Sequence, residues 1–284
     1  MNVIEATGLG KRYRGTWALR ECTLAIPEGH VVALVGPNGA GKTTLLNMSV
    51  GLTAPTEGRA TVLGGQLAGS AAALDGTAFV AQDAPLYKNL SAGDMLHLTR
   101  NVNRRWDQRY AEVRLAELGI PLKKKAGKLS GGQQAQLALT LALARRPTLL
   151  VLDEPVAMLD PVARHDFMAS VMTAAAEDGV SVVLSSHVLA ELERVADYLI
   201  LLSGGRVQVA GEVDDLLACH RVLTGPPVLT SRWAWAWARR SCTTRSRAAH
   251  SSASAAGPVS TRWQASRSST SPATCTRPPD SRMR

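Results

Sequence analysis

The sequence predicts an α/β fold in which functional loops follow buried strands. Three short apolar runs support this prediction: Val31–Val35 precedes a glycine-rich loop, Leu149–Leu152 precedes two carboxylates, and residues 180–186 precede a histidine. Short continuous apolar runs are typical of buried strands, and open α/β sheets bind ligands at the carboxyl ends of their strands. We therefore expect the residues after these runs to form the functional site.

The first run leads into a phosphate-binding loop. Residues 36–44 read GPNGAGKTT and fit the pattern G-x4-G-K-[ST], with a helical pattern beginning at residues 44–48. Glycines let the backbone curl so that its N–H groups point at phosphate oxygens, while the lysine adds a full charge and the threonines add hydroxyls, one of them for Mg2+. A bare glycine-rich turn is the alternative interpretation. The predicted phosphate-binding residues are Gly36, Pro37, Asn38, Gly39, Ala40, Gly41, Lys42, Thr43 and Thr44, with Thr43 also a metal ligand.

Two carboxylates, Asp153 and Glu154, follow the strand Leu149–Leu152. Adjacent strand residues face opposite ways, so the two side chains can hold different functions. Asp153 suits Mg2+ binding, and Glu154 suits polarising the attacking water. An acidic pair at a strand end can also be an ordinary helix cap, but the phosphate-binding loop favours the catalytic interpretation.

Residues 129–133 read LSGGQ and precede an amphipathic segment at residues 135–144. A serine and two glycines at the start of a helix make a second possible anion site, because helix N-termini attract negative charge. A polar turn before the helix is the alternative.

Taken together, these motifs resemble the ATP-binding subunits of ABC transporters, and the resemblance runs over residues 4–226. It implies a RecA-like P-loop NTPase core with a mainly parallel sheet in residues 1–225, and an inserted helical subdomain at about residues 88–145. It also implies a head-to-tail dimer with ATP and Mg2+ between the subunits. Ser130, Gly131, Gly132 and Gln133 are then expected to bind ATP in trans.

Four further positions match the family. Tyr13 matches the aromatic residue that stacks on adenine, although an exposed tyrosine at a strand end is the simpler explanation. Gln82, after the apolar residues 77–81, matches the glutamine that touches Mg2+ and water. Asp160 matches an aspartate that crosses the dimer interface, and a helix N-cap before Pro161 explains it almost as well. His187 matches the histidine that holds the γ-phosphate.

The resemblance implies that ATP hydrolysis drives a separate membrane permease. Residues 53–65, 103–110 and 185–207 look like bacterial multidrug and antibiotic exporters, so we expect export of a small molecule whose identity resides in the permease. A soluble ABC ATPase and an ATP-gated scaffold are the alternatives. The short segment between Gln82 and Leu129 argues against the first, and intact Glu154 and His187 argue against the second.

Composition favours a protein of the cytoplasmic face of the membrane. No window of 18 apolar residues lacks a charge and no signal peptide follows Met1, so we expect the chain to reach the membrane by docking to its permease. The four cysteines, Cys22, Cys219, Cys242 and Cys275, show neither C-x-x-C spacing nor a histidine cluster, which argues against a zinc site.

The end of the chain, residues 226–284, is a basic low-complexity tail. Its ten arginines and single acid, Asp280, account for the whole formal net charge of +9. Only Val228, Leu229 and Val259 are Leu, Ile, Val or Phe. A segment this poor in large apolar residues cannot offset its own ordering entropy, so we expect it to be disordered.

Two explanations of this tail compete. Trp233, Trp235 and Trp237 near Arg239 and Arg240 suit a basic arm that binds nucleic acid or lipid headgroups. The tail also lacks Lys, Ile, Asn, Phe and Tyr, whose codons are AT-rich. A shifted reading frame in a GC-rich gene produces a composition of this kind. We favour the shifted frame and expect no specific nucleic-acid partner.

Overall fold

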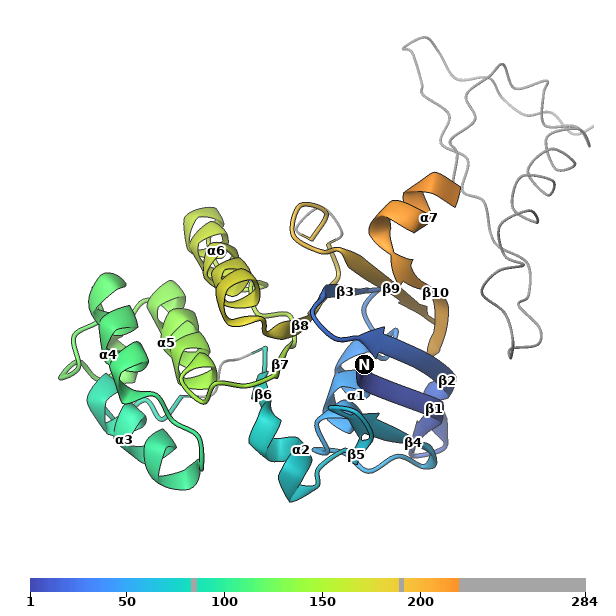
Figure 1. The fold of residues 1–284 in the computed structure, drawn as a ribbon, viewed down its shortest axis with the longest axis horizontal. Coiled ribbons are helices and arrows are strands. Elements are labelled where there is room, and N and C mark those ends of the chain that lie inside the picture. The colour runs from blue at the N-terminus through green and yellow to red at the C-terminus, as the bar shows by residue number, and fades with distance from the viewer. Residues whose placement is uncertain (83–85, 189–191, 220–284) are drawn as a thin grey trace, which may run out of the picture. The chain divides into compact units, whose positions relative to one another are not determined.

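The structure is a computed structural model that describes residues 1–82, 86–188 and 192–219 (Figure 1). Residues 1–216 form one compact unit, and residues 217–284 are grouped as a second. Only residues 217–219 of the second unit are described, so the predicted disorder of residues 226–284 lies outside the described residues.

A six-stranded sheet carries the strands predicted to be buried. Its order is β10-β9-β3-β8-β7-β6, in which the five strands from β9 to β6 run parallel and β10 is antiparallel to β9. The prediction of a mainly parallel sheet is therefore confirmed. The strands are β3 (Val31–Val35), β6 (Thr77–Val80), β7 (Leu149–Leu152), β8 (Ser181–Ser186), β9 (Tyr198–Ser203) and β10 (Arg206–Glu212).

The register of this sheet sets the edge at which the site forms. Val35 pairs with Ser186, and Leu152 pairs with Leu184. Because these strands are parallel, the loops after β3, β7 and β8 leave from the same edge. Every residue of the three strands is buried, as expected for central parallel strands with both faces covered.

A second, antiparallel sheet has the order β2-β1-β4-β5. Its strands are β1 (Asn2–Tyr13), β2 (Thr16–Pro27), β4 (Glu57–Val62) and β5 (Gln66–Leu67). In β2 the buried Cys22, Leu24 and Ile26 alternate with exposed residues, which is the pattern of a strand with one face toward the core. This sheet and α1 (Lys42–Ser49) share a hydrophobic core with one face of the parallel sheet, including Val32 and Leu34.

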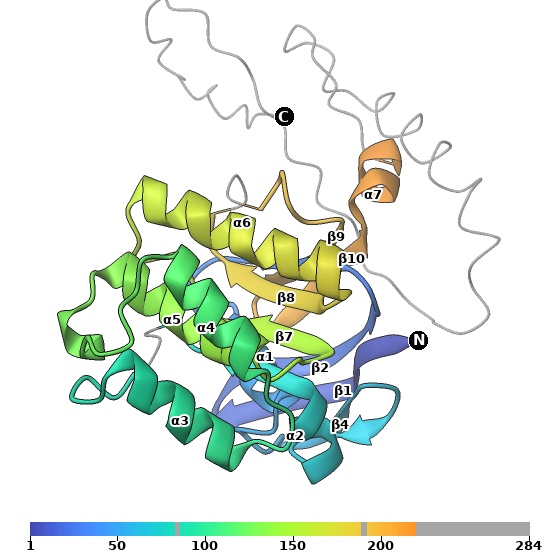
Figure 2. The same cartoon turned by 60° about the vertical axis from the view of Figure 1, so that its left-hand side comes forward.

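Helices cover the other face of the parallel sheet. Phe167 of α6 (Pro161–Asp178) is fully buried in a core that also holds Leu139 of α5 (Gly131–Leu143) and Val35 of β3. Burial of a side chain of this size contributes about 1.5–3 kcal/mol. Figure 2 shows α5 and α6 running side by side over β7 and β8. Two further short helices are α2 (Ala71–Gly76) and α7 (Val213–Cys219).

The segment predicted to be a helical insertion contains α3 (Ala92–Val102), α4 (Gln108–Glu117) and the 3-10 turn Ala126–Lys128. These elements and α5 enclose a hydrophobic core of their own, which includes Leu96, Leu115 and Leu137. Residues 135–143 of α5 are all buried, so the amphipathic pattern predicted for residues 135–144 was wrong. The reason is that α5 packs against the sheet core on one side and against this helical core on the other.

Candidate active site

The loop between β3 and α1 is closely packed against neighbouring backbone. A Cβ atom on Gly36 would lie 2.2 Å from the carbonyl oxygen of Leu202. Gly41 has φ 102°, and a Cβ atom there would lie 2.6 Å from the carbonyl oxygen of Ala18. Gly41 is the N-cap of α1 and no side chain caps this helix, so its first N–H groups and its dipole are suited to an anion such as phosphate.

Lys42 is the first residue of α1 and is only 5% exposed. Its Nζ donates to the carbonyl oxygens of Gly36 at 2.9 Å and of Pro37 at 3.4 Å, and it forms an ion pair with Oε1 of Glu154 at 3.2 Å. A buried ammonium requires such compensation, because an unpaired charge is costly to remove from water. This structure therefore satisfies the Lys42 charge entirely with protein oxygens.

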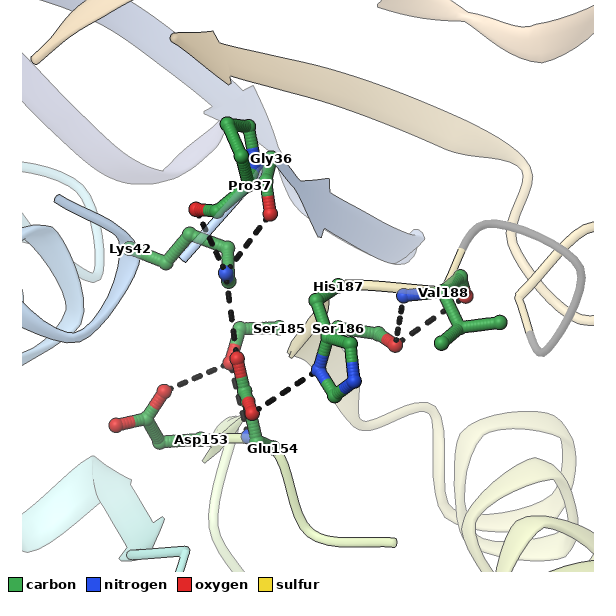
Figure 3. Close-up of polar contacts among 9 residues, drawn as sticks. All are labelled: Gly36, Pro37, Lys42, Asp153, Glu154, Ser185, Ser186, His187 and Val188. Atoms are coloured by element: carbon green, nitrogen blue, oxygen red, sulfur yellow. Dashed lines mark hydrogen bonds and ion pairs between the residues drawn. The ribbon is translucent and has the colours of Figure 1, made fainter. Parts of the chain in front are cut away.

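Glu154 joins the ends of three strands into one cluster, shown in Figure 3. Its Oε1 contacts Lys42, after β3, and its Oε2 lies 3.2 Å from Nδ1 of His187, after β8. The backbone of Glu154 has φ 44°, a left-handed conformation that non-glycine residues seldom adopt outside functional or strained sites. Glu154, predicted as the catalytic base, therefore contacts both the predicted phosphate ligand Lys42 and the predicted γ-phosphate ligand His187.

Ser185 also belongs to this cluster, although the sequence analysis did not identify it. Its Oγ donates to Oδ1 of Asp153 at 2.7 Å and accepts from the backbone N–H of Glu154 at 2.9 Å. Both Ser185 and Asp153 are buried, 1% and 3% exposed. The available sequence signal was a serine placed directly after the apolar residues 182–184, where a further apolar residue is expected in a buried strand.

The predicted metal ligands are one carboxylate, one hydroxyl and one amide. Asp153 is buried at the end of β7, whereas Thr43 and Gln82 are exposed after β3 and β6. Within residues 1–82, 86–188 and 192–219, no group of three or more His, Cys, Asp or Glu could hold a metal by itself. The donor set thus fits Mg2+ that takes its other ligands from substrate phosphate and water, as Mg2+ commonly does.

Tyr13 lies at the end of β1 with 46% of its surface exposed. Lys11 Nζ is 5.3 Å from the centre of its ring. The exposed ring is suited to stacking on a planar ligand, but the structure equally fits a tyrosine at a strand end.

A second group of predicted residues lines a separate groove. Ser130 is the N-cap of α5: its Oγ accepts from the N–H of Gln133 at 3.2 Å, while Oε1 of Gln133 accepts from the N–H of Ser130 at 3.3 Å. Asp160 caps α6 by accepting from the N–H groups of Val162 and Ala163 at 3.0 and 2.9 Å. The groove is lined by Leu118, Ile120, Ser130, Gly132, Gln133, Gln136, Asp160, Val162, Ala163 and Asp166.

The N-termini of α5 and α6 approach each other closely in this groove. A Cβ atom on Gly132 would lie 2.8 Å from Cβ of Ala163, so a larger residue would force the helices apart. The Asp160 carboxylate already caps the N-terminus of α6, so within this groove the N-terminus of α5 is the end better suited to a bound anion. In the described part of the chain, no hydrogen bond or ion pair connects Ser130, Gln133 or Asp160 to Lys42, Glu154 or His187.

Comparison with known proteins gives a consistent result. A family model described as ABC transporter matches residues 19–157. An Fe(3+) ions import ATP-binding protein of Pseudomonas fluorescens is 36% identical over 218 residues, which are 74% of this chain and 62% of that protein. A phosphonates import ATP-binding protein of Thiobacillus denitrificans is 34% identical, with coverage of 77% and 90%. A Nod factor export ATP-binding protein of Rhizobium etli is 32% identical, with coverage of 78% and 72%.

Solved structures resemble the fold. The ATP binding subunit of an ABC transporter is 28% identical with a TM-score of 0.67, and the match covers 76% of this chain and 92% of that one. A dimeric ATP-binding cassette in a post-hydrolysis state, bound to ADP and Pi, is 26% identical with a TM-score of 0.65, and coverage is 74% and 98%. The chain spans about 62% of the length of the iron-import relative. Tyr13, Asp160 and His187 lie outside the stretch that the family model matches.

Proposed function

This chain belongs to the ATP-binding subunits of ABC transporters, and we propose that it hydrolyses ATP to drive transport by a separate membrane permease. The observation that carries this proposal is the contact of Glu154 with both Lys42 and His187, each at 3.2 Å. A carboxylate between a phosphate-binding lysine and a histidine is suited to orienting a water beside a γ-phosphate, which supports the proposal.

Each residue of this cluster has a specific part in the proposed reaction. Glu154 orients the water that attacks the γ-phosphorus, and Lys42 and the N–H groups of the loop bind the phosphate oxygens as the bond to ADP breaks. His187 donates a hydrogen bond to the γ-phosphate. Thr43, Asp153 and Gln82 would hold Mg2+, which when bound neutralises phosphate charge.

We further propose that two copies of the chain form the working unit, with ATP between the loop of one copy and residues 130–133 of the other. The hydroxyl of Ser130 accepts the capping bond from Gln133, and its own proton stays available for a phosphate oxygen. Asp160 lies in the same groove. The dimeric cassette bound to ADP and Pi supports this arrangement, since 98% of that chain is covered by the match.

The direction of transport is a finer proposal, and we favour export on the strength of residues 53–65, 103–110 and 185–207. The relatives described above include both import and export proteins. Within the described ranges, no helix is long and apolar enough to cross a membrane. Because its relatives are ATP-binding proteins of transporters, we propose that the chain docks to its permease at the cytoplasmic face of the membrane. A long coiled-coil insertion, expected of some soluble relatives, does not fit the 11 residues of α3 and the 10 of α4.

The test of the proposed activity is phosphate release from Mg-ATP by the purified full chain, measured alone and together with a candidate permease. Lys42→Ala, which removes the phosphate ligand, is the matched inactive control. Mg2+-dependent hydrolysis that this variant lacks supports the proposal. If the chain binds ATP but does not hydrolyse it, either alone or with the permease, the result would favour an ATP-gated scaffold instead.

The direction of transport requires a second experiment. The chain and the permease are reconstituted in vesicles, and accumulation of candidate drug-like substrates is measured with the chain on the outer surface. Export from the cytoplasmic face appears as ATP-dependent accumulation inside these vesicles. ATP-dependent loss of preloaded substrate from them shows import instead.

A further inference from the structure

We propose that Ser185 is a positioning residue that holds Asp153 and Glu154 in their working orientations. The proposal rests on the ATP hydrolysis proposed above and assigns a function to a residue outside the phosphate-binding, metal-binding and catalytic sets. Ser185 is not expected to touch ATP, because both of its hydrogen-bond partners are protein groups and it is 1% exposed.

The direction of the two hydrogen bonds is fixed by chemistry. The backbone N–H of Glu154 can only donate, so the Ser185 oxygen accepts that bond at 2.9 Å. The single hydroxyl proton is then donated to Oδ1 of Asp153 at 2.7 Å. One hydroxyl therefore constrains the side chain of the proposed metal ligand and the backbone of the proposed base at the same time (Figure 3).

The position of Ser185 follows from strand register. β7 and β8 pair in parallel up to Leu152 and Leu184. Two residues after Leu152 the chain turns away from the sheet, because Glu154 has φ 44°. The Ser185 hydroxyl accepts this hydrogen bond where the pairing of β7 with β8 ends. It gives the Glu154 N–H a partner in a partly buried place, where an unpaired N–H would be costly.

The orientation of Glu154 matters because its two carboxylate oxygens have different partners. Oε1 contacts Lys42 and Oε2 contacts His187, both at 3.2 Å. If the backbone rotates out of the left-handed conformation, the carboxylate moves and both contacts cannot be kept. A shift of about 1 Å in a catalytic group can cost on the order of 10²-fold in rate.

Ser181 provides a matched control within the same strand. It is also 1% exposed, and its Oγ also accepts from a backbone N–H, that of Gly29, at 2.9 Å. Ser181 lies at the opposite end of β8 from the candidate site. Ser181→Ala therefore reproduces the loss of a buried serine hydrogen bond without touching Asp153 or Glu154.

The experiment compares Ser185→Ala, Ser185→Thr, Ser185→Val and Ser181→Ala in the full chain. We expect kcat to fall about tenfold or more in Ser185→Ala and Ser185→Val, with KM for ATP changed less than about threefold, because water positioning is lost while the loop remains. Ser185→Thr keeps the hydroxyl and should retain kcat within about threefold of wild type. Thr and Val have nearly the same shape, so this pair isolates the hydroxyl if the alanine variant folds poorly.

A second measurement does not depend on turnover. The affinity for a fluorescent ATP analogue is measured across Mg2+ concentrations, and Ser185→Ala and Ser185→Val should need about threefold or more Mg2+ for half-maximal binding, since Asp153 is no longer held. Ser181→Ala and Ser185→Thr should match the wild type.

Specific results would overturn the proposal. The first is a wild-type kcat and a wild-type Mg2+ dependence in Ser185→Ala or Ser185→Val. The second is a loss of kcat in Ser181→Ala equal to that in Ser185→Ala. The third is a kcat of Ser185→Thr no higher than that of Ser185→Val. If the wild type itself hydrolyses no ATP, the proposed function fails, and the Mg2+ titration alone then decides the function of Ser185.

Discussion

Lys42 and Glu154 form an ion pair at 3.2 Å, with side chains only 5% and 13% exposed. The pair compensates two charges in a place largely closed to water. When phosphate oxygens reach Lys42 they compete with Glu154 for the same ammonium. We therefore expect the ion pair to oppose ATP binding, and its loss to release Glu154 to orient water.

This competition gives a prediction for Glu154→Gln. We expect turnover to fall by on the order of 10²-fold or more, because the neutral amide cannot act as a base. We expect ATP affinity to stay equal or to rise, because the amide competes less strongly for Lys42. Phosphate release and equilibrium binding of a fluorescent ATP analogue measure the two effects. Lys42→Ala is the contrast, since it should weaken binding itself; wild-type turnover in Glu154→Gln would show that another group is the base.

For single residues, the sequence predicted a functional position where the residue belongs to a contiguous motif. Lys42, Asp153 and Glu154 follow strands that could be recognised from their apolar runs. Ser185 could not be assigned, because its function depends on which residue of β7 lies beside it, and register between distant strands is not readable from either strand alone. The two explanations of Asp160 were also not separable by sequence; the structure shows the N-cap, and its part in a dimer remains a proposal.

The N-terminus of α5 is the part of this helix that we propose to contact ATP in the dimer. Its capping box, Ser130 with Gln133, lies in the same groove as Asp160. An arginine at residue 130 would fill this groove and remove the hydroxyl proposed to meet phosphate. The neighbouring Gly132 leaves little room for adjustment, since even a Cβ atom there would lie 2.8 Å from Ala163.

We therefore expect Glu154→Gln to dimerise with Mg-ATP, and the added Ser130→Arg to abolish that dimer. Light scattering after size exclusion measures both. Ser91→Arg on the same background is the matched control, because Ser91 forms an equivalent capping box on α3 with Asp94, and the loss of either cap costs about 1 kcal/mol. An ATP-dependent dimer that survives Ser130→Arg would contradict the shared site.

Asp107 at the start of α4 gives an element-scale prediction for stability. Its side chain accepts from the N–H of Tyr110 at 2.8 Å and pairs with Arg146 at 2.8 Å. Arg146 also pairs with Asp178 at 2.7 Å, so this arginine joins α4 to the end of α6. The Tyr110 N–H first, and then Arg146, lower the pKa of Asp107 below its ordinary value.

Because the pKa of Asp107 is lower in the folded state, its ionised carboxylate stabilises the fold fully at pH values above the pKa of the unfolded chain, about 3.9. This stabilisation is lost as pH falls through the lower pKa of the folded state. We expect Asp107→Ala to reduce the free energy of unfolding by about 1 kcal/mol at pH 7. The difference from wild type should narrow as pH falls from about 4 toward 3. Urea unfolding at several pH values tests this, with the exposed Glu117→Ala in the same helix as control. A difference that is unchanged by acid would exclude the ionised cap as its source.

The elements themselves were predictable in part. Val31–Val35 and Leu149–Leu152 have the predicted bounds, and β8 begins one residue later than predicted, at Ser181. The helix after the glycine-rich loop begins at Lys42, earlier than residue 44, because Gly41 rather than a polar side chain is its N-cap. The antiparallel pairing of β1 with β4 was not predicted, since it joins residues about fifty positions apart and no local pattern specifies the partner.

For the whole molecule, formal charge is divided very unevenly. Residues 1–225 are neutral overall, because residues 226–284 account for the entire net charge of +9. Every residue proposed here for catalysis, metal binding or ATP binding precedes residue 226. The compact unit that holds these residues ends at Leu216. The activity of this unit and the effect of the basic tail can therefore be measured separately.

We expect a chain that stops after Gly225 to keep its ATPase rate per mole within a few-fold of full length. The removed segment has too little apolar surface to offset ordering costs of about 1–2 kcal/mol per residue, so it should contribute no folded contacts. The shortened chain should also bind less to anionic vesicles and to nucleic acid, because it loses all of the +9 charge. Phosphate release, vesicle sedimentation and limited proteolysis of both chains test this. A protease-resistant tail, or loss of hydrolysis on truncation, would show that residues 226–284 fold and contribute, and would rule out a shifted reading frame.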